Sequence, residues 1–197
     1  MFYECKNKIR TISMPYRQMV NISNFLDTES TNVFLYYAKN TNAWQEYADD
    51  FWKGRIFNFS KFEGQLKIVS DYLIQDIKKY IKQKYDAEVY CDTIDIVRWP
   101  EGWSQPPHID GCKGLEYRDY GCIIYLNDDF DGGETYYPNL NIKVKPKSGT
   151  IVVHPGDEKH LHGVTEVKNN TRYTIASFWT ITKDKASYDS VHKYCGQ

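Results

Sequence analysis

The sequence predicts an α+β fold that is mainly β, with a double-stranded β-helix (jelly-roll) core and supporting helices on its N-terminal side. Two patterns lead to this prediction. Apolar residues recur at helical spacing up to about residue 86, and short alternating or apolar runs separated by turn residues follow. The abundance of Tyr (17), Phe (9) and Trp (5) also favours strands, in which aromatic side chains are enriched.

Two amphipathic helices are expected in the first half. Asp27 or Thr28 would be the N-cap of the first. The second is clearer, because Ser60 and Glu63 have the spacing of a capping box ahead of a long apolar stripe. The expected helices cover 27–39 and 61–83, and the stripe of the second comprises Phe62, Leu66, Val69, Leu73, Ile77, Tyr80 and Ile81.

The strand-like segments begin near residue 87. They are bounded by clusters of Gly, Pro, Asn and Asp, and KNNT at 168–171 has the character of a hairpin turn that joins the last two strands. Many short strands with close turns are typical of a sandwich or barrel of the jelly-roll type. The expected strands are 88–99, 120–127, 141–146, 149–155, 162–167 and 172–181, with a turn-rich connection at 128–135.

We expect a single domain over residues 1–197, because nothing separates the two halves into independent units. The helical support would cover about 1–86, the jelly-roll core about 87–182, and a C-terminal tail 183–197. The net charge of -1 offers no field for attracting nucleic acid, and no apolar run approaches the roughly 20 residues of a membrane-spanning helix. We therefore expect neither nucleic acid nor a membrane as a partner.

The cysteines do not form a pattern that indicates disulfides or a zinc site. There are five, an odd number, and no C-x-x-C pair occurs. The first 18 residues carry scattered charges and lack the apolar segment of a signal peptide. Both features lead us to expect a cytoplasmic protein.

Candidate chemistry begins with His108-Ile109-Asp110. On a strand, residues i and i+2 point to the same side, so this pair would offer an imidazole and a carboxylate to one metal ion. The motif is short and by itself weak, since it also fits a surface loop after two prolines.

A second arm is formed by His162 and by Arg172, ten residues later. Two His and one carboxylate form the facial triad of non-haem Fe(II) oxygenases, which leaves positions open for a bidentate co-substrate and oxygen. Arg172 would return close to His162 on the adjacent strand and grip a carboxylate with two parallel hydrogen bonds. His160 and His154 are rivals for the third ligand, although His154 precedes Pro-Gly and fits a loop better.

At this point residues 96–182 resemble the catalytic domain of the prolyl 4-hydroxylase-like branch of the 2-oxoglutarate/Fe(II) oxygenases. The matching pieces, in order, are PPHID, YGCIIYLNDDFDGGETYYP, VKPKSGTIVVHPG and LHGVTEVKNNTRYTIASFWT. The resemblance implies that His108, Asp110 and His162 bind iron and that Arg172 holds the distal carboxylate of 2-oxoglutarate. It also implies that Tyr125 bonds the same carboxylate.

Three further residues are candidates. Thr174 shares the face of Arg172 and could add a hydroxyl contact with the co-substrate. Trp99 and Trp103 stand in a Pro- and Gly-rich loop leading to the first ligand, where they could line a peptide groove or simply cover the end of the sheet.

The resemblance implies a 2-oxoglutarate-dependent dioxygenase that uses Fe(II), 2-oxoglutarate and O2, with ascorbate as a supporting reductant. We expect it to act as a prolyl hydroxylase on a peptide or protein that contains proline, because such segments are already shaped for docking. Hydroxylation of a free amino acid or other small molecule is the main alternative. A nucleic-acid demethylase or a non-catalytic cupin-like metal-binding module fits less well, since the charge is balanced and a bare metal site needs no arginine clamp.

Overall fold

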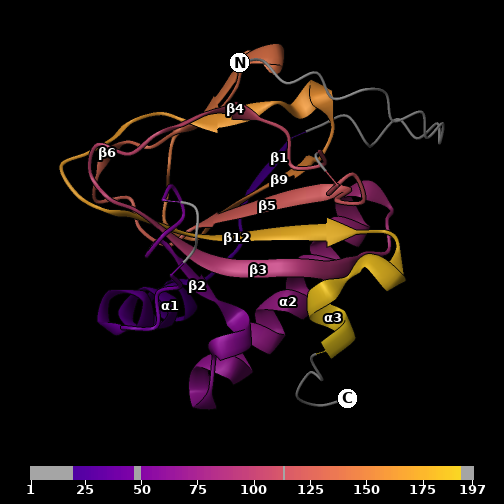
Figure 1. Cartoon of the computed structure of the whole chain (residues 1–197), viewed down its shortest axis with the longest axis horizontal. Coiled ribbons are helices and arrows are strands. Elements are labelled where there is room, and N and C mark those ends of the chain that lie inside the picture. The colour runs from indigo at the N-terminus through magenta and orange to yellow at the C-terminus, as the bar shows by residue number, and fades with distance from the viewer. Residues whose placement is uncertain (1–19, 47–49, 113, 192–197) are drawn as a thin grey trace.

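The computed structural model describes residues 20–46, 50–112 and 114–191. The N-terminal stretch that we examined for a signal, together with Cys5 and Cys195, lies outside these residues. Figure 1 shows a six-stranded sheet in the middle of the molecule, a four-stranded sheet above it, and α1, α2 and α3 below it. The facing antiparallel sheets form the jelly-roll core that the sequence predicts, with α1 and α2 as its support.

The six-stranded sheet has the order β1-β9-β5-β12-β3-β2, and the four-stranded sheet has the order β4-β10-β7-β8. A small two-stranded sheet pairs β11 with β6. All the pairings are antiparallel. The strands are β1 Asn21–Asn24, β2 Ile56–Asn58, β3 Tyr90–Trp99, β4 Gln105–His108, β5 Tyr120–Tyr125, β6 Asp131–Gly132, β7 Thr135–Tyr137, β8 Ile142–Val144, β9 Thr150–Pro155, β10 His162–Val164, β11 Val167–Lys168 and β12 Arg172–Thr180.

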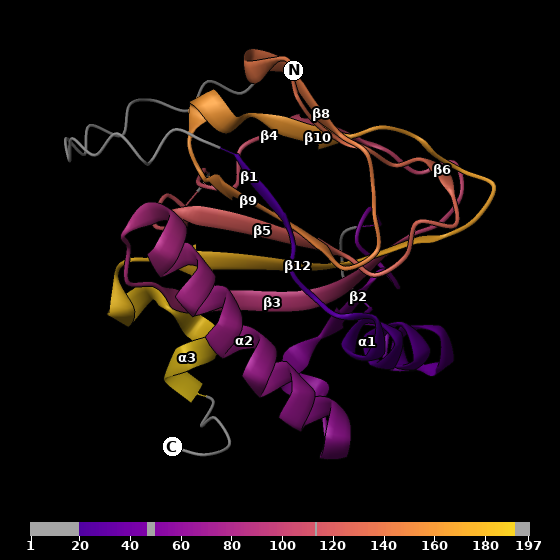
Figure 2. The same ribbon diagram turned by 180° about the vertical axis from the view of Figure 1, so that it is seen from behind.

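The helices lie on the outer face of the six-stranded sheet, which Figure 2 shows from behind. Strand β3 explains this arrangement, because Ile94 and Ile96 are fully buried toward the helices while Thr93, Asp95 and Val97 line a cavity on the other face. Burying each Ile contributes about 1.5–3 kcal/mol. The helices are α1 Thr28–Asn40, α2 Gly64–Tyr85 and α3 Ser187–Val191, with short 3-10 turns at Phe59–Lys61, Pro138–Leu140, Glu158–His160 and Lys183–Lys185.

The helix starts confirm one capping prediction and contradict the other. Asp27 caps α1, since its carboxylate accepts a hydrogen bond from the Ser30 amide at 2.7 Å. The capping box predicted for the second helix is wrong. Ser60 belongs to a separate 3-10 turn, α2 begins after Glu63, and the Glu63 side chain makes no cap bond. Gly64, with φ +57°, turns the chain between the two elements.

The predicted strands are present, but two parts of the topology differ from the prediction. Strands β1 and β2 come from the half predicted as helical support, and they form both edges of the six-stranded sheet. Segments 162–167 and 172–181 do not form a hairpin, because β10 pairs with β4 and β7 whereas β12 pairs with β3 and β5. The segment 165–171, which includes β11, therefore carries the chain from the four-stranded sheet to the six-stranded sheet. None of the described helices has the length and apolar character needed to cross a bilayer.

Candidate metal centre and its cavity

Three side chains gather between the two sheets in a group that could hold a metal ion. His108 ends β4, Asp110 follows in the bend after it, and His162 begins β10. His108 and His162 are register partners in adjacent strands, and ligand atoms of all three side chains lie within 4.8 Å of one another. The pairing of β4 with β10 thus brings the His108-Ile109-Asp110 motif next to His162, which lies far from it in the sequence.

Local sequence features allow this close pairing. Pro106 and Pro107 lie in β4, which is an edge strand where a missing amide hydrogen is tolerated. Gly163, directly after the second histidine, faces a crowded spot. A Cβ there would lie 2.6 Å from the Gln105 carbonyl oxygen and 2.8 Å from the Tyr136 ring. Only glycine lets β10 approach both of its neighbours this closely.

The backbone fixes which ring nitrogen of each histidine faces the group. Nδ1 of His162 lies 3.0 Å from the His160 carbonyl oxygen, and Nδ1 of His108 lies 3.3 Å from that of Pro106. A carbonyl only accepts, so each Nδ1 carries the hydrogen and each Nε2 presents a lone pair. Both Nε2 atoms lie near Oδ1 of Asp110, at 3.7 Å for His108 and 3.8 Å for His162.

The charge states suit a divalent cation. Burial lowers the pKa of His162 to about 4 and also lowers that of His108, so both rings are neutral at pH 7. Burial alone would raise the pKa of Asp110, but His162 and His154 together hold it below its usual range. Two neutral imidazoles and one carboxylate are therefore available as ligands.

The two rival histidines, His160 and His154, are not part of the ligand group. The ring of His160 is buried, with Nδ1 at 2.6 Å from the Asp157 carboxylate, and it is not part of the ligand group. The prediction that His154 lies in a loop is wrong. It stands in β9, is 1% exposed, and bonds the Asp110 carboxylate and the Tyr137 hydroxyl.

The ligand group opens into a cavity of about 520 Å³ between the sheets. Arg172 and Thr174 of β12 line it from the six-stranded sheet, on the same face as the sequence predicts. Arg172 therefore reaches the site from the opposite sheet, rather than from the strand next to His162. Tyr125 is the register partner of Thr174 on β5, and its buried hydroxyl bonds the Thr135 hydroxyl at 2.7 Å.

One end of this cavity carries buried donors that lack acceptors. Among the described residues, Nε of Arg172 and Nε1 of Trp99 have no hydrogen-bond partner. Arg172 is 1% exposed and Trp99 is 4% exposed, and both line the cavity. Burial lowers the pKa of Arg172, while Tyr125 opposes this shift. Because unpaired buried donors are costly, this end is suited to an anion with several oxygen atoms.

The two tryptophans predicted to line a peptide groove have different surroundings. Trp99 lies in the cavity wall beside Arg172, with the guanidinium carbon 5.3 Å from its ring centre. Trp103 is half-buried in an aromatic cluster. Its ring centre lies 5.5 Å from that of Phe51 and 4.3 Å from the guanidinium carbon of Arg55. It is not among the residues that line the cavity.

The other end of the cavity contains residues that sequence reasoning missed. Phe178 and Asp95 line it from β12 and β3, and the Arg118 guanidinium lies 4.0 Å from the Phe178 ring centre. Burial raises the pKa of Asp95 to about 6, although Asn58 donates a 2.6 Å hydrogen bond to it. The alternation of β3 and the spacing of six residues from Arg172 to Phe178 could have indicated this face.

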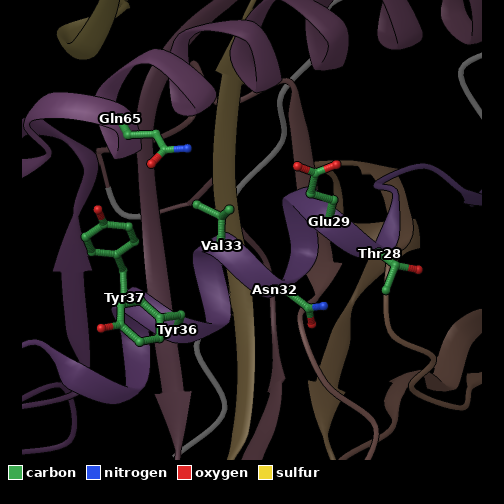
Figure 3. A pocket seen from close by; sticks show the side chains of 7 residues that line it. All are labelled: Thr28, Glu29, Asn32, Val33, Tyr36, Tyr37 and Gln65. Carbon is green, nitrogen blue, oxygen red and sulfur yellow. The ribbon is translucent and has the colours of Figure 1, made fainter.

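A second hollow, of about 620 Å³, lies over α1 and the start of α2. Figure 3 shows its lining, in which Tyr36 and Tyr37 stand side by side and Glu29 is the one carboxylate. Although this hollow is larger, none of the predicted site residues reaches it. The chemistry is therefore expected in the cavity between the sheets.

Comparison with known proteins agrees with this arrangement. Residues 95–180 match the model of the 2OG-Fe(II) oxygenase superfamily. The chain is 33% identical over 86 residues to prolyl 3-hydroxylase 2 from Mus musculus, covering 41% of this chain and 11% of that protein. It is 32% identical over 162 residues to prolyl 3-hydroxylase 1 from Homo sapiens, covering 66% of this chain and 22% of that protein. The chain thus spans about a fifth or less of the length of these relatives.

The fold is also similar to a solved prolyl hydroxylase from Trichoplax adhaerens, which is in complex with a peptide fragment of the hypoxia inducible factor oxygen degradation domain. The TM-score is 0.68 at 20% sequence identity, and the match covers 86% of each chain. At this identity the likeness shows the fold alone.

Proposed function

We propose that this chain, whose residues 95–180 match the model of the 2OG-Fe(II) oxygenase superfamily, is a member of it and a dioxygenase that hydroxylates prolyl residues in a peptide or protein. The observation that carries the proposal is the meeting of two features in one cavity. A His-Asp-His group that could hold a metal faces the same space as a buried arginine with an unpaired donor.

The residues present fit Fe(II). His108, Asp110 and His162 would hold it through the two Nε2 atoms and Oδ1, which the backbone contacts of the rings leave free. When bound, iron with 2-oxoglutarate and O2 would supply the oxidising power that C–H hydroxylation requires. Ascorbate would serve only as a supporting reductant.

The residues present also fit 2-oxoglutarate. Arg172 would bind its distal carboxylate, because the unpaired Nε of this buried guanidinium needs an acceptor. Tyr125 and Thr174, neighbours across β5 and β12, would support the same end through their hydroxyl groups. Trp99 also has an unpaired donor there, so we propose that it contacts the co-substrate in addition to, or in place of, a peptide.

A prolyl substrate would enter at the end that holds Phe178 and Asp95. His108 is the most exposed of the three proposed ligands, with 34% of its side chain accessible, compared with 4% for Asp110 and 6% for His162. The metal would therefore be approached past His108. A proline ring is a compact apolar group, and the Phe178 ring beside it offers a matching surface. Trp103 would affect such a peptide only from outside the cavity.

A free amino acid is the second candidate, and one observation favours it. The carboxylate of Asp95 and the guanidinium of Arg118 both line the cavity. Together they could recognise the amino and carboxyl groups of a small zwitterion. Nε of Arg118 however already bonds the Asp92 carboxylate at 2.8 Å. Fewer of its donors are therefore free for a substrate carboxylate, which favours a peptide substrate over a free amino acid.

We also propose that the protein works in a reducing compartment such as the cytoplasm. The described cysteines Cys91 and Cys122 are free thiols, and both are buried. Thiols of this kind need no oxidising environment to reach the folded state. The redox state of the thiols in protein isolated from its own cells tests this part of the proposal.

The test of function is succinate release from 2-oxoglutarate, with Fe(II) and ascorbate, in the presence of three kinds of candidate substrate. These are proline-containing peptides, the same peptides with proline replaced by alanine, and free proline. We expect stimulation by the first kind alone, with one oxygen atom added to the peptide by mass spectrometry. Equal stimulation by the proline and alanine peptides, or by free proline alone, would contradict the peptidyl-proline assignment.

A further inference from the structure

A chain of hydrogen bonds runs from Asp110, one of the proposed metal ligands, to His154 and then to Tyr137. Oδ2 of Asp110 lies 2.9 Å from Nε2 of His154, and Nδ1 of His154 lies 2.9 Å from the Tyr137 hydroxyl. All three residues are buried, and Tyr137 is fully so. The chain joins the two sheets, since His154 is in β9 and Tyr137 is in β7.

The donors and acceptors along this chain are consistent. An ionised carboxylate only accepts hydrogen bonds, so Nε2 of His154 carries the hydrogen and donates it to Oδ2. In a neutral imidazole the other nitrogen is then an acceptor, which takes the hydrogen of the Tyr137 hydroxyl. Every polar atom of the His154 ring is thereby satisfied without water.

The two oxygens of Asp110 consequently have different environments. Oδ1 faces the two proposed ligands, with Nε2 of His108 at 3.7 Å and Nε2 of His162 at 3.8 Å. Oδ2 is instead bonded to His154. One oxygen is thus presented to a metal and the other is held by the protein.

A glycine on the neighbouring strand leaves room for this bond. Gly121 of β5 is the register partner of His154. A Cβ at this position would lie 2.3 Å from Oδ2 of Asp110 and 2.5 Å from Nε2 of His154. No side chain fits at this point of β5, so the strand has a glycine where the Asp110–His154 contact passes.

We propose that His154, itself oriented by Tyr137, is a positioning residue that holds Oδ2 of Asp110 and leaves Oδ1 as the single carboxylate oxygen for the metal. The inference rests on the metal centre proposed above. Its consequence is that Asp110 cannot occupy a second coordination position, which stays available to the co-substrate. Orienting contacts of this kind are typically worth 10–100-fold in metal affinity or activity.

The experiment measures Mn(II) binding to the full chain under anaerobic conditions, by calorimetry and by the Mn(II) electron paramagnetic resonance signal. His154→Phe removes the donor and keeps an aromatic ring, so Mn(II) binding should weaken by about 10–100-fold. His154→Gln retains an amide donor and should recover part of the loss. Tyr137→Phe, which only removes the hydroxyl that orients the ring, should give a smaller loss.

Thermal unfolding separates positioning from a purely structural role. The rise in Tm on adding Mn(II) should shrink in His154→Phe, whereas a structural role would lower Tm equally with and without the metal. His160→Phe is the matched control, because it removes another buried histidine that bonds a different carboxylate. If His154→Phe fails to fold, Tyr137→Phe and His154→Gln decide the question by the same two readouts.

The outcomes also separate this inference from the proposed function. Unchanged Mn(II) affinity in all three variants, with normal binding by the unaltered protein, would overturn the positioning role alone. Absence of Mn(II) binding by the unaltered protein would overturn the metal centre and this inference together. Peptide hydroxylation does not enter these readouts, so a wrong substrate assignment would not affect them.

Discussion

Trp99 and Arg172 are register partners on β3 and β12, and the Arg172 guanidinium carbon lies 5.3 Å from the Trp99 ring centre. Trp99 also packs against a second buried arginine, Arg55, whose guanidinium carbon lies 4.1 Å from its ring centre. Burial lowers the pKa of Arg55 to about 10, and Arg172 adds to this effect. The indole thus contacts two like charges, and both Trp99 and Arg172 keep an unpaired donor at the cavity.

Replacing Trp99 should therefore impair use of the co-substrate. Trp99→Phe keeps an aromatic ring in contact with the arginines but removes the indole donor. We expect a several-fold higher KM for 2-oxoglutarate, because a neutral hydrogen bond contributes on the order of 1 kcal/mol. Trp103→Phe is the matched control, and its KM for 2-oxoglutarate should be unchanged. If instead only the KM for the peptide rose, Trp99 would contact the peptide and not the co-substrate.

The arginine itself should matter more than the indole. Truncating one partner of a buried charge pair costs about 2–5 kcal/mol, so Arg172→Ala should raise the 2-oxoglutarate requirement at least tenfold. Arg172→Lys should restore only part of the loss, since an ammonium lacks the forked geometry. Tyr125→Phe should give a smaller rise. Steady-state succinate release as a function of 2-oxoglutarate concentration measures the effect of all three variants. If the rate of Arg172→Ala depended on 2-oxoglutarate as the rate of the unaltered protein does, Arg172 would not bind the co-substrate.

The third ligand is tested by a pair of nearby histidines. His162→Ala should abolish Fe(II) binding and turnover, because two ligands are too few for a labile ferrous ion. His160→Ala should retain most activity, since its ring bonds Asp157 instead and lies outside the ligand group. Calorimetric Fe(II) titration distinguishes the two variants. An essential His160 with a dispensable His162 would reverse the assignment.

Asp95 gives a pH-dependent prediction for stability without metal. Burial raises its pKa in the folded protein to about 6 from an ordinary 3.8, so folding favours the protonated form. This stabilisation of the folded state is complete below pH 3.8 and is lost as the pH rises toward 6. Asp95→Asn should therefore raise Tm at pH values above 6, and the gain should diminish as the pH falls through this window.

The control for this prediction is Asp76→Asn on α2, where 58% of the aspartate side chain is accessible. Its Tm should follow that of the unaltered protein at every pH. A Tm difference for Asp95→Asn that does not change with pH would show that Asp95 is not protonated preferentially in the folded state.

Much of the fold could be predicted from the sequence because it depends on local periodicity. The alternation in β3 and the apolar runs of β5, β9 and β12 identify strands, and the stripe on α2 identifies a helix. The pairing of β1 and β2 with distant strands could not be found in this way. A strand of three or four residues is too short to show a period, and its partners lie far away in sequence.

In the site, too, some features could be predicted from local sequence and others depend on long-range strand pairing. Spacing and resemblance single out His108, Asp110, His162 and Arg172, which the fold brings to one cavity. They do not reveal that β10 and β12 belong to facing sheets, because sheet membership depends on long-range pairing. For the same reason the sequence wrongly predicts His154 in a loop, although it stands in β9. Its neighbours Asp110 and Tyr137 are 44 and 17 residues away in the chain.

The central claim, a metal-dependent prolyl oxygenase, is tested most directly by isotope incorporation. A proline-containing peptide is incubated with the protein, Fe(II), 2-oxoglutarate and dioxygen made of a heavy oxygen isotope, and the product is analysed by fragmentation mass spectrometry. We expect one heavy oxygen atom on a proline, in an amount matched by succinate release, and none with His162→Ala. Succinate release without any labelled proline, or labelled proline formed equally by His162→Ala, would contradict the account.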